Sequence, residues 1–222
     1  MTVRELISDS IPSVKPTDTA ALALDWMSEF KVSQLPLVAD GIYQGLVTEE
    51  AILDRADPDR PLQGQHLMSG ESAYIYHENH IYDAIDLMTN LRLEVLPVVA
   101  EERAYQGVVT LRDIGGLLGN LFAVQEPGGV LVLSIPAHSY VLSEVGRIAE
   151  SADAKVLSLY LSSLPDSKDM LLTLKLNVED LSRVVAAFER FDYEVVRTFH
   201  RVKPLEDYSR NLDAFMKYLG ME

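Results

Sequence analysis

The residues best suited to chemistry stand together in one short run, Gly107-Val108-Val109-Thr110-Leu111-Arg112-Asp113. The Asp113 carboxylate can accept hydrogen bonds from two neighbouring hydroxyl groups, which is what a ribose diol offers. The Thr110 hydroxyl and the backbone N–H groups at a helix start suit a phosphate, and Arg112 adds a positive charge beside them. The run therefore contains the groups that a nucleotide site needs.

The same run also fits a purely structural role. Thr110 and Asp113 have the spacing of a capping box, in which a threonine accepts a helix N–H and an acid three residues later reaches back. Helix starts are far commoner than ribose sites, so the run alone favours the cap. Both roles stay open, because one pair of residues can serve both.

An earlier copy of this run shows that the first half of the chain is duplicated. An offset of 61 aligns Leu35-Pro36-Leu37-Val38 with Leu96-Pro97-Val98-Val99, and one extra turn residue then aligns Gly45-Leu46-Val47-Thr48 with Gly107-Val108-Val109-Thr110. Each copy predicts the order strand, helix, strand, strand, helix. A unit of about 60 residues is too small to bury a robust core alone. We therefore expect the two copies to pack against each other.

The repeated h-x-x-L-P-V-V and G-h-h-T-x-x-D pattern resembles the paired CBS domain, or Bateman module, over roughly residues 1–122. The resemblance implies two βαββα repeats, here residues 1–61 and 62–124, with two clefts between them. It also implies that the clefts bind adenine nucleotides (AMP, ADP or ATP) or a related adenosyl ligand such as S-adenosylmethionine, without reaction. Modules of this family usually pair, so the resemblance implies a homodimer.

By the same resemblance, the better ligand site belongs to the second copy. Thr110 and Asp113 would hold the ribose and phosphate, and the purine would lie on nearby apolar surface. The candidates for this site are Tyr74, Tyr76, Leu96, Pro97, Thr110, Arg112 and Asp113. A weaker site in the first copy would use Ser13, Leu35, Pro36 and Thr48. There Ala51 replaces the aspartate and cannot bond a ribose, which predicts an asymmetric module.

A turn-rich break at residues 125–129 separates the repeat from a part of different character. Residues 129–202 predict the order βαββαβ, with Asn177 capping the second helix, and this is the ferredoxin-like pattern. Behind a CBS pair it resembles the ACT domain of acetoin-utilisation-type CBS proteins. Tyr140 stands where that family has a glycine near its effector loop, which favours a filled, dimerising scaffold over an amino-acid site.

Residues 203–222 predict an amphipathic C-terminal helix, because Tyr208, Leu212, Phe215 and Leu219 recur at helical spacing. The whole chain is thus expected to be α+β or α/β: a CBS-domain pair of two βαββα repeats, a ferredoxin-like, ACT-like domain and a final helix.

Charge and composition exclude several kinds of function. The chain has 34 Asp plus Glu against 19 Lys plus Arg, and this net charge of −15 disfavours nucleic acid as a partner. Residues 1–122 hold 19 acids and 8 bases, so −11 of that charge lies in the repeat. The absence of cysteine excludes disulfides, thiolate metal sites and a cysteine nucleophile. No apolar run approaches a membrane span, so we expect a soluble, cytoplasmic protein without membrane contact.

No catalytic or metal-binding group is expected. His77 and His80 have no third ligand at local spacing, and no nucleophile motif is present. We therefore expect a non-catalytic sensor without a required cofactor, in which an adenine nucleotide in the repeat biases the C-terminal domain or a regulated protein partner. The alternative is a constitutive dimeric adaptor that has lost its ligand sites, as Ala51 and Tyr140 indicate.

Overall fold

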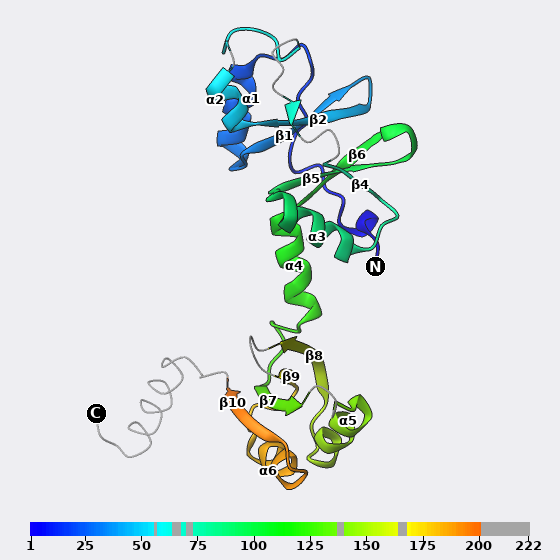
Figure 1. The fold of residues 1–222 in the computed structure, drawn as a ribbon, viewed down its shortest axis with the longest axis vertical. Helices are drawn as coiled ribbons and strands as arrows, with labels where there is room; N and C mark the ends of the chain where they lie inside the picture. The colour runs from blue at the N-terminus through cyan, green and yellow to red at the C-terminus, as the bar shows by residue number, and fades with distance from the viewer. Residues whose placement is uncertain (56, 64–67, 70–72, 137–139, 164–167, 201–222) are drawn as a thin grey trace, which may run out of the picture. The chain divides into compact units, whose positions relative to one another are not determined.

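The computed structural model describes residues 1–55, 57–63, 68–69, 73–136, 140–163 and 168–200 (Figure 1). The chain divides into two compact units, Met1–Leu117 and Leu118–Glu222. This division falls inside the helix α4 (Leu111–Leu121), ahead of the predicted linker at 125–129. The predicted C-terminal helix at 203–222 lies outside the described residues.

The first copy of the repeat forms a small sheet with two helices. Its elements are η1 (Val3–Leu6), α1 (Ala20–Phe30), β1 (Gln34–Ala39), β2 (Ile42–Thr48) and α2 (Glu49–Arg55). Thr19 caps α1 by accepting the Leu22 N–H at 3.2 Å, and Lys31 in the left-handed conformation ends it. The strands β1 and β2 are antiparallel, and β3 (Met68–Ser69) pairs with the free edge of β2.

The second copy repeats this arrangement and also has the predicted first strand, which in the first copy is reduced to a bridge between Val14 and Leu37. Its elements are β4 (Ile75–Tyr76), α3 (Ile81–Leu91), β5 (Val95–Val99), η2 (Glu101–Arg103), β6 (Tyr105–Thr110) and α4. The sheet order is β4-β5-β6, with β4 parallel and β6 antiparallel to β5. His80 caps α3 by accepting the Tyr82 N–H at 3.2 Å, while the Asp83 carboxylate accepts the His80 N–H at 3.2 Å.

The two copies exchange their leading segments, which are residues 7–11 in the first copy and 68–69 in the second. Ser8 pairs with Val108 of β6 through two backbone hydrogen bonds of 2.9 and 3.1 Å. At the equivalent place Ser69 pairs with Leu46 of β2. Val108 also lies in one apolar core with residues of the first copy. The expected packing of the two copies is confirmed, and each copy completes the sheet of the other.

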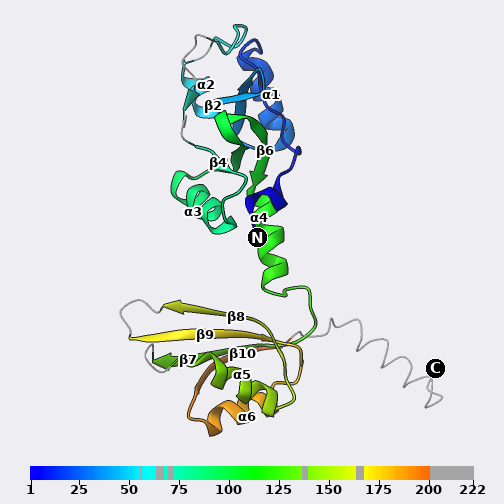
Figure 2. The ribbon, with the colours of Figure 1, turned by 90° about the vertical axis from the view of Figure 1, so that its right-hand side faces the viewer.

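The second unit contains β7 (Val130–Pro136), α5 (Leu142–Ser151), β8 (Val156–Ser163), β9 (Asp169–Leu176), α6 (Ser182–Arg190) and β10 (Glu194–Phe199). This is the predicted element order βαββαβ. Neighbouring strands are antiparallel in the order β10-β7-β9-β8. Figure 2 shows α5 and α6 on one face of this sheet, where Leu133, Leu172 and Phe188 form part of a buried core.

Two predictions for this unit can be compared with the structure. Asn177 does not cap α6, because its side chain accepts the Lys155 N–H at 2.7 Å and the helix begins only at Ser182. The prediction of a cap at Asn177 is wrong. Tyr140 is partly buried and packs against the core of the unit. Residues 137–139, between the end of β7 and Tyr140, lie outside the described part of the chain.

Two tyrosines make the stability of the first unit sensitive to alkaline pH. Burial raises the pKa of Tyr43 and of Tyr105 above the ordinary tyrosine value. In the unfolded chain both phenols ionise near pH 10 (about the free value), whereas in the folded chain they stay protonated. The free energy of unfolding is therefore unaffected by these groups below about pH 10 and falls as the pH rises above it.

We expect Tyr105→Phe to reduce this alkaline slope by about one proton, or ~1.4 kcal/mol per pH unit. Urea unfolding between about pH 9 and about pH 11.5 measures the slope. Tyr82→Phe is the matched control, because Tyr82 is 68% exposed. A slope that Tyr105→Phe leaves unchanged would mean that this phenol already ionises freely in the folded protein.

Candidate functional site

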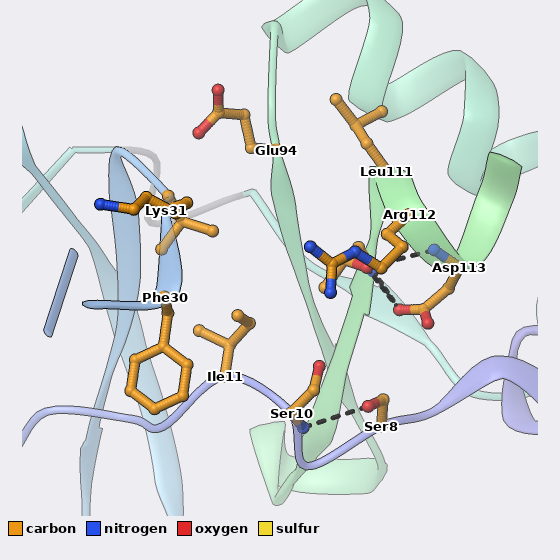
Figure 3. Close-up of a pocket in the computed structure, with 11 residues that line it drawn as sticks. Ser8, Ser10, Ile11, Phe30, Lys31, Glu94, Leu111, Arg112 and Asp113 are labelled. Carbon is orange, nitrogen blue, oxygen red and sulfur yellow. Dashed lines mark hydrogen bonds between the residues drawn. The ribbon is translucent and has the colours of Figure 1, made fainter. Parts of the chain in front are cut away.

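A cavity of about 320 Å³ lies between the leading segment of the first copy and the start of α4 in the second (Figure 3). Its volume is in the range of small-molecule sites. It is lined by Ser8, Ser10, Ile11, Phe30, Lys31, Val32, Glu94, Thr110, Leu111, Arg112 and Asp113. The exchange of leading segments explains why residues about a hundred positions apart meet here, since Ser8 pairs with β6 just before Thr110.

The capping box at the start of α4 is formed, and it leaves part of the Asp113 carboxylate available. Asp113 Oδ2 accepts the Thr110 N–H at 2.8 Å and the Thr110 hydroxyl at 2.6 Å. Thr110 Oγ1 in turn accepts the Asp113 N–H at 3.2 Å. Among the described residues, none donates to Asp113 Oδ1. The pair therefore caps α4, and this cap uses Asp113 Oδ2 while Oδ1 stays available to a ligand.

The charges of the cavity are balanced, in contrast to the strongly acidic repeat around it. Lys31 and Arg112 are exposed, and neither forms an ion pair within the described ranges. Figure 3 shows the Arg112 side chain extending from the start of α4 over the cavity. Two carboxylates, Glu94 and Asp113, offset these two cations. An anionic group thus meets a locally balanced set of charges here rather than the −11 of residues 1–122.

Glu94 is occupied in holding the two copies together. Its Oε2 accepts both the Ser33 N–H and the Ser33 hydroxyl at 2.9 Å. Ser33 and Glu94 are equivalent positions of the repeat, 61 residues apart, so this contact lies where the two copies meet by pseudo-symmetry. Ile42 and Ala104 form a second such pair of equivalent positions, joined as a β-bridge. The cavity is therefore bounded by a contact that depends on the arrangement of the copies.

Glu94→Ala is expected to lower the free energy of unfolding by about 1–3 kcal/mol, because it leaves the Ser33 N–H and hydroxyl without their charged acceptor. Urea unfolding of the whole chain measures the change. Glu101→Ala is the matched control, since this exposed acid in η2 should change stability by less than about 0.5 kcal/mol. Equal midpoints for the two variants would show that the Ser33–Glu94 contact does not link the copies.

The apolar side of the cavity comes from the first copy. Ile11 is buried, and Phe30 and Val32 are partly buried at the end of α1. Sequence reasoning missed these residues, together with the polar ones Ser8, Ser10, Lys31 and Glu94. The leading segments of the two copies align at the offset of 61. This offset is the same whether each segment pairs with its own copy or with the other, so the alignment could not reveal the exchange.

The predicted residues of the second-copy site do not all meet. Thr110, Arg112 and Asp113 line the cavity. Leu96 and Pro97 are buried inside β5. The two remaining residues lie in a separate row of rings, in which Tyr74 contacts Tyr43 and Tyr76 at centroid distances of 5.8 and 5.7 Å, with the Arg103 guanidinium 5.1 Å above Tyr74.

The predicted residues of the weaker first-copy site are also dispersed. Ser13 lines a separate hollow of about 500 Å³ near the β1–β2 turn, whose lining does not include the other three. Leu35 and Pro36 are buried within β1. The Thr48 hydroxyl accepts the Ala51 N–H at 3.2 Å and so begins α2.

The two histidines considered for a metal serve other contacts. His77 Nδ1 lies 3.4 Å from the Val99 carbonyl oxygen, and His80 caps α3. In the part of the chain that the structure describes, no three His, Cys, Asp or Glu side chains are grouped so as to hold a metal ion. Over the same residues, no helix has both the length and the apolar character needed to cross a bilayer.

Comparison with known proteins identifies the family that the repeat resembles. The family model of the CBS domain matches residues 3–57 and 65–118. The chain is 28% identical over 111 residues to inosine-5'-monophosphate dehydrogenase of Methanocaldococcus jannaschii, a match that covers 50% of this chain and 22% of the dehydrogenase. It is 25% identical over 127 residues to an uncharacterized 17.7 kDa protein of Acidianus ambivalens, covering 55% and 76% of the two chains. The chain thus spans less than a quarter of the dehydrogenase.

Among solved structures, a CBS domain pair/ACT domain protein from Thermotoga maritima shares 26% sequence identity. The match has a TM-score of 0.49 and covers 53% of this chain and 96% of that one.

Proposed function

The chain belongs to the CBS domain family through two domains at residues 3–57 and 65–118, and from this we propose that it is a non-catalytic regulatory sensor that binds an adenine nucleotide or a related adenosyl ligand between them. CBS pairs commonly bind such ligands. CBSX2 is in complex with AMP, and the CBS pair of another protein is in complex with 5-methylthioadenosine and S-adenosyl-L-methionine.

One observation carries the proposal for this chain: Asp113 Oδ1 is available in a cavity whose two cations, Lys31 and Arg112, have no ion pair among the described residues. The ribose diol donates hydrogen bonds to this oxygen, while Oδ2 keeps the helix cap. The phosphate lies at Arg112, and the purine lies on the apolar surface of Ile11 and Phe30. No group in the cavity acts as a nucleophile, so the ligand is bound and released unchanged.

Lys31 and Arg112 favour a phosphate monoester within this ligand class. A phosphate monoester carries a charge of about −1.5 to −2 near pH 7, and these two cations are the groups that would pair with it, while Glu94 and Asp113 hold hydrogen bonds to Ser33 and Thr110. The acidic surface around the cavity acts over longer distances and is screened within about 10 Å at ordinary salt. AMP is therefore the ligand to test before ATP, whose additional phosphates would face the surrounding acids.

The C-terminal unit is proposed to be the part that receives the signal. Its order β10-β7-β9-β8 with antiparallel neighbours supports a ferredoxin-like, ACT-like domain. Tyr140, packed against its core, supports a dimerising scaffold over an amino-acid site. The proposal includes a cytoplasmic homodimer, with domains at 1–61, 62–124 and 129–202 followed by the segment 203–222.

Thermal unfolding of the whole chain with AMP, ATP, S-adenosylmethionine, amino acids and divalent cations tests this function. A ligand present at about 100 times its Kd stabilises the folded state by ~2.7 kcal/mol, which raises Tm by several degrees. We expect such a rise with AMP and none with amino acids. A panel in which no compound changes Tm would contradict the sensor and favour the ligand-free dimeric adaptor.

A further inference from the structure

The helix α4 connects the cavity with the C-terminal unit. Its first turn holds the Thr110–Asp113 capping box in the cavity wall. Its last residues, 118–121, already belong to the second compact unit. The next residue, Phe122, contacts the Tyr160 ring at a centroid distance of 5.3 Å, and its carbonyl accepts the Ser158 hydroxyl at 3.0 Å. The residue that follows α4 is therefore in direct contact with β8.

Three glycines weaken this helix without a steric reason. Gly115, Gly116 and Gly119 lie within its 11 residues. A Cβ added at any of the three would meet no heavy atom within 4 Å. Alanine would fit each position and would favour the helix, because glycine loses more backbone freedom on becoming helical.

At the end of α4, an alanine stands at a position where glycine would be more stable. Its last turn closes as a Schellman motif, in which the Val124 N–H donates to the Gly119 carbonyl and the Ala123 N–H donates to the Asn120 carbonyl, both at 3.0 Å. Ala123 has φ 50°, a left-handed conformation that favours glycine at this position. The helix thus has glycine where alanine is more stable and alanine where glycine is more stable.

We propose that α4 is only marginally stable in the ligand-free protein and that ligand in the cavity orders it, so that occupancy passes along this helix to the C-terminal unit. The inference rests on the proposed function of the cavity. An anionic group at the first turn stabilises a helix through its dipole, which is the interaction that remains here, because the Leu111 and Asp113 N–H groups already donate to the Glu94 carbonyl and the Thr110 hydroxyl. Binding and helix order are then linked reciprocally, so a substitution that stabilises α4 must also tighten the ligand.

Two variants with opposite substitutions test this link in the whole chain. Gly116→Ala/Gly119→Ala and Ala123→Gly leave the cavity lining intact, and both are expected to stabilise α4. Amide hydrogen exchange of residues 117–122 in the ligand-free protein should slow by about fivefold for each substitution. The affinity for AMP, measured by calorimetry, should rise by about threefold.

Gly146→Ala provides the matched control. Gly146 lies inside α5, where an added Cβ also meets nothing within 4 Å, so the substitution stabilises a helix remote from the linkage. It should leave the affinity for AMP unchanged.

Two results would overturn the inference alone: wild-type AMP affinity in both α4 variants, or amides of α4 that exchange as slowly as those of β6 before ligand is added. Failure of the wild type to bind AMP or any other adenosyl ligand would overturn the proposed function together with the inference.

Discussion

Replacing Asp113 by alanine is expected to weaken AMP binding by about 10- to 100-fold, because the ribose loses a charged acceptor that contributes about 1.5–3 kcal/mol. Calorimetric titration of the whole chain measures the change. The same substitution removes the acid of a helix cap, so it should also lower the free energy of unfolding by about 0.5–2 kcal/mol. The two effects have different origins and need to be separated.

Asp83→Ala separates them. Asp83 occupies the same position in the capping box of α3, where its carboxylate accepts the His80 N–H, but it does not line the cavity. This variant should lose similar stability and keep wild-type affinity for AMP. If Asp113→Ala binds AMP as the wild type does, the Thr110–Asp113 pair is a helix cap alone and the proposed site is wrong.

Gly107→Ala is expected to give the largest loss of stability in the repeat, about 2–4 kcal/mol. A Cβ at this position would lie 2.7 Å from Ile7 Cγ2 and 3.1 Å from the Ser8 carbonyl oxygen, and the residue has φ +132°. Relieving these contacts requires Ile7 and Ser8 of the leading segment to shift. Because Ser8 lines the cavity, we expect weaker AMP binding as well as a lower urea midpoint.

Gly41→Ala is the control for backbone strain. Gly41 also has a positive φ, +79°, but an added Cβ there meets nothing within 4 Å. Its loss of stability therefore measures strain alone, and the additional loss in Gly107→Ala measures the contact with the exchanged segment. Equal losses in the two variants, with AMP affinity intact in both, would contradict the claim that the leading segment must lie against β6.

The sequence is sufficient to predict most of the elements and that the copies pack. Apolar periodicity and the offset of 61 predict two similar units, and the structure and the CBS family match confirm them except at the first strand of the first copy, which is reduced to a bridge between Val14 and Leu37. The partner of each leading segment is not predictable in this way. Ser8 and Ser69 are equivalent, so the repeat pattern is the same whether each pairs within its own copy or across. Ser8, Ser10 and Ile11 reach the cavity only through the exchange.

Local patterns also misled where a tertiary contact competes with them. Asn177 precedes an apolar helical stripe and resembles a cap, yet its side chain accepts a hydrogen bond from the Lys155 N–H. The Asp180 carboxylate accepts the Ser182 N–H at the actual helix start.

The net charge of the repeat is also a poor guide to the charge of the cavity. The repeat is strongly acidic, but Lys31 and Arg112 come together only in the folded cavity, so sequence counts overstate the repulsion that an anionic ligand meets.

Photolabelling with an azido derivative of AMP, followed by peptide mapping, tests the central claim that the ligand lies between the copies. We expect the label on residues 8–11 or 30–32 of the first copy, and we expect Asp113→Ala to abolish it although this aspartate belongs to the second copy. Label on the row of rings at Tyr74 and Tyr76, or labelling that Asp113→Ala leaves unchanged, would contradict the claim.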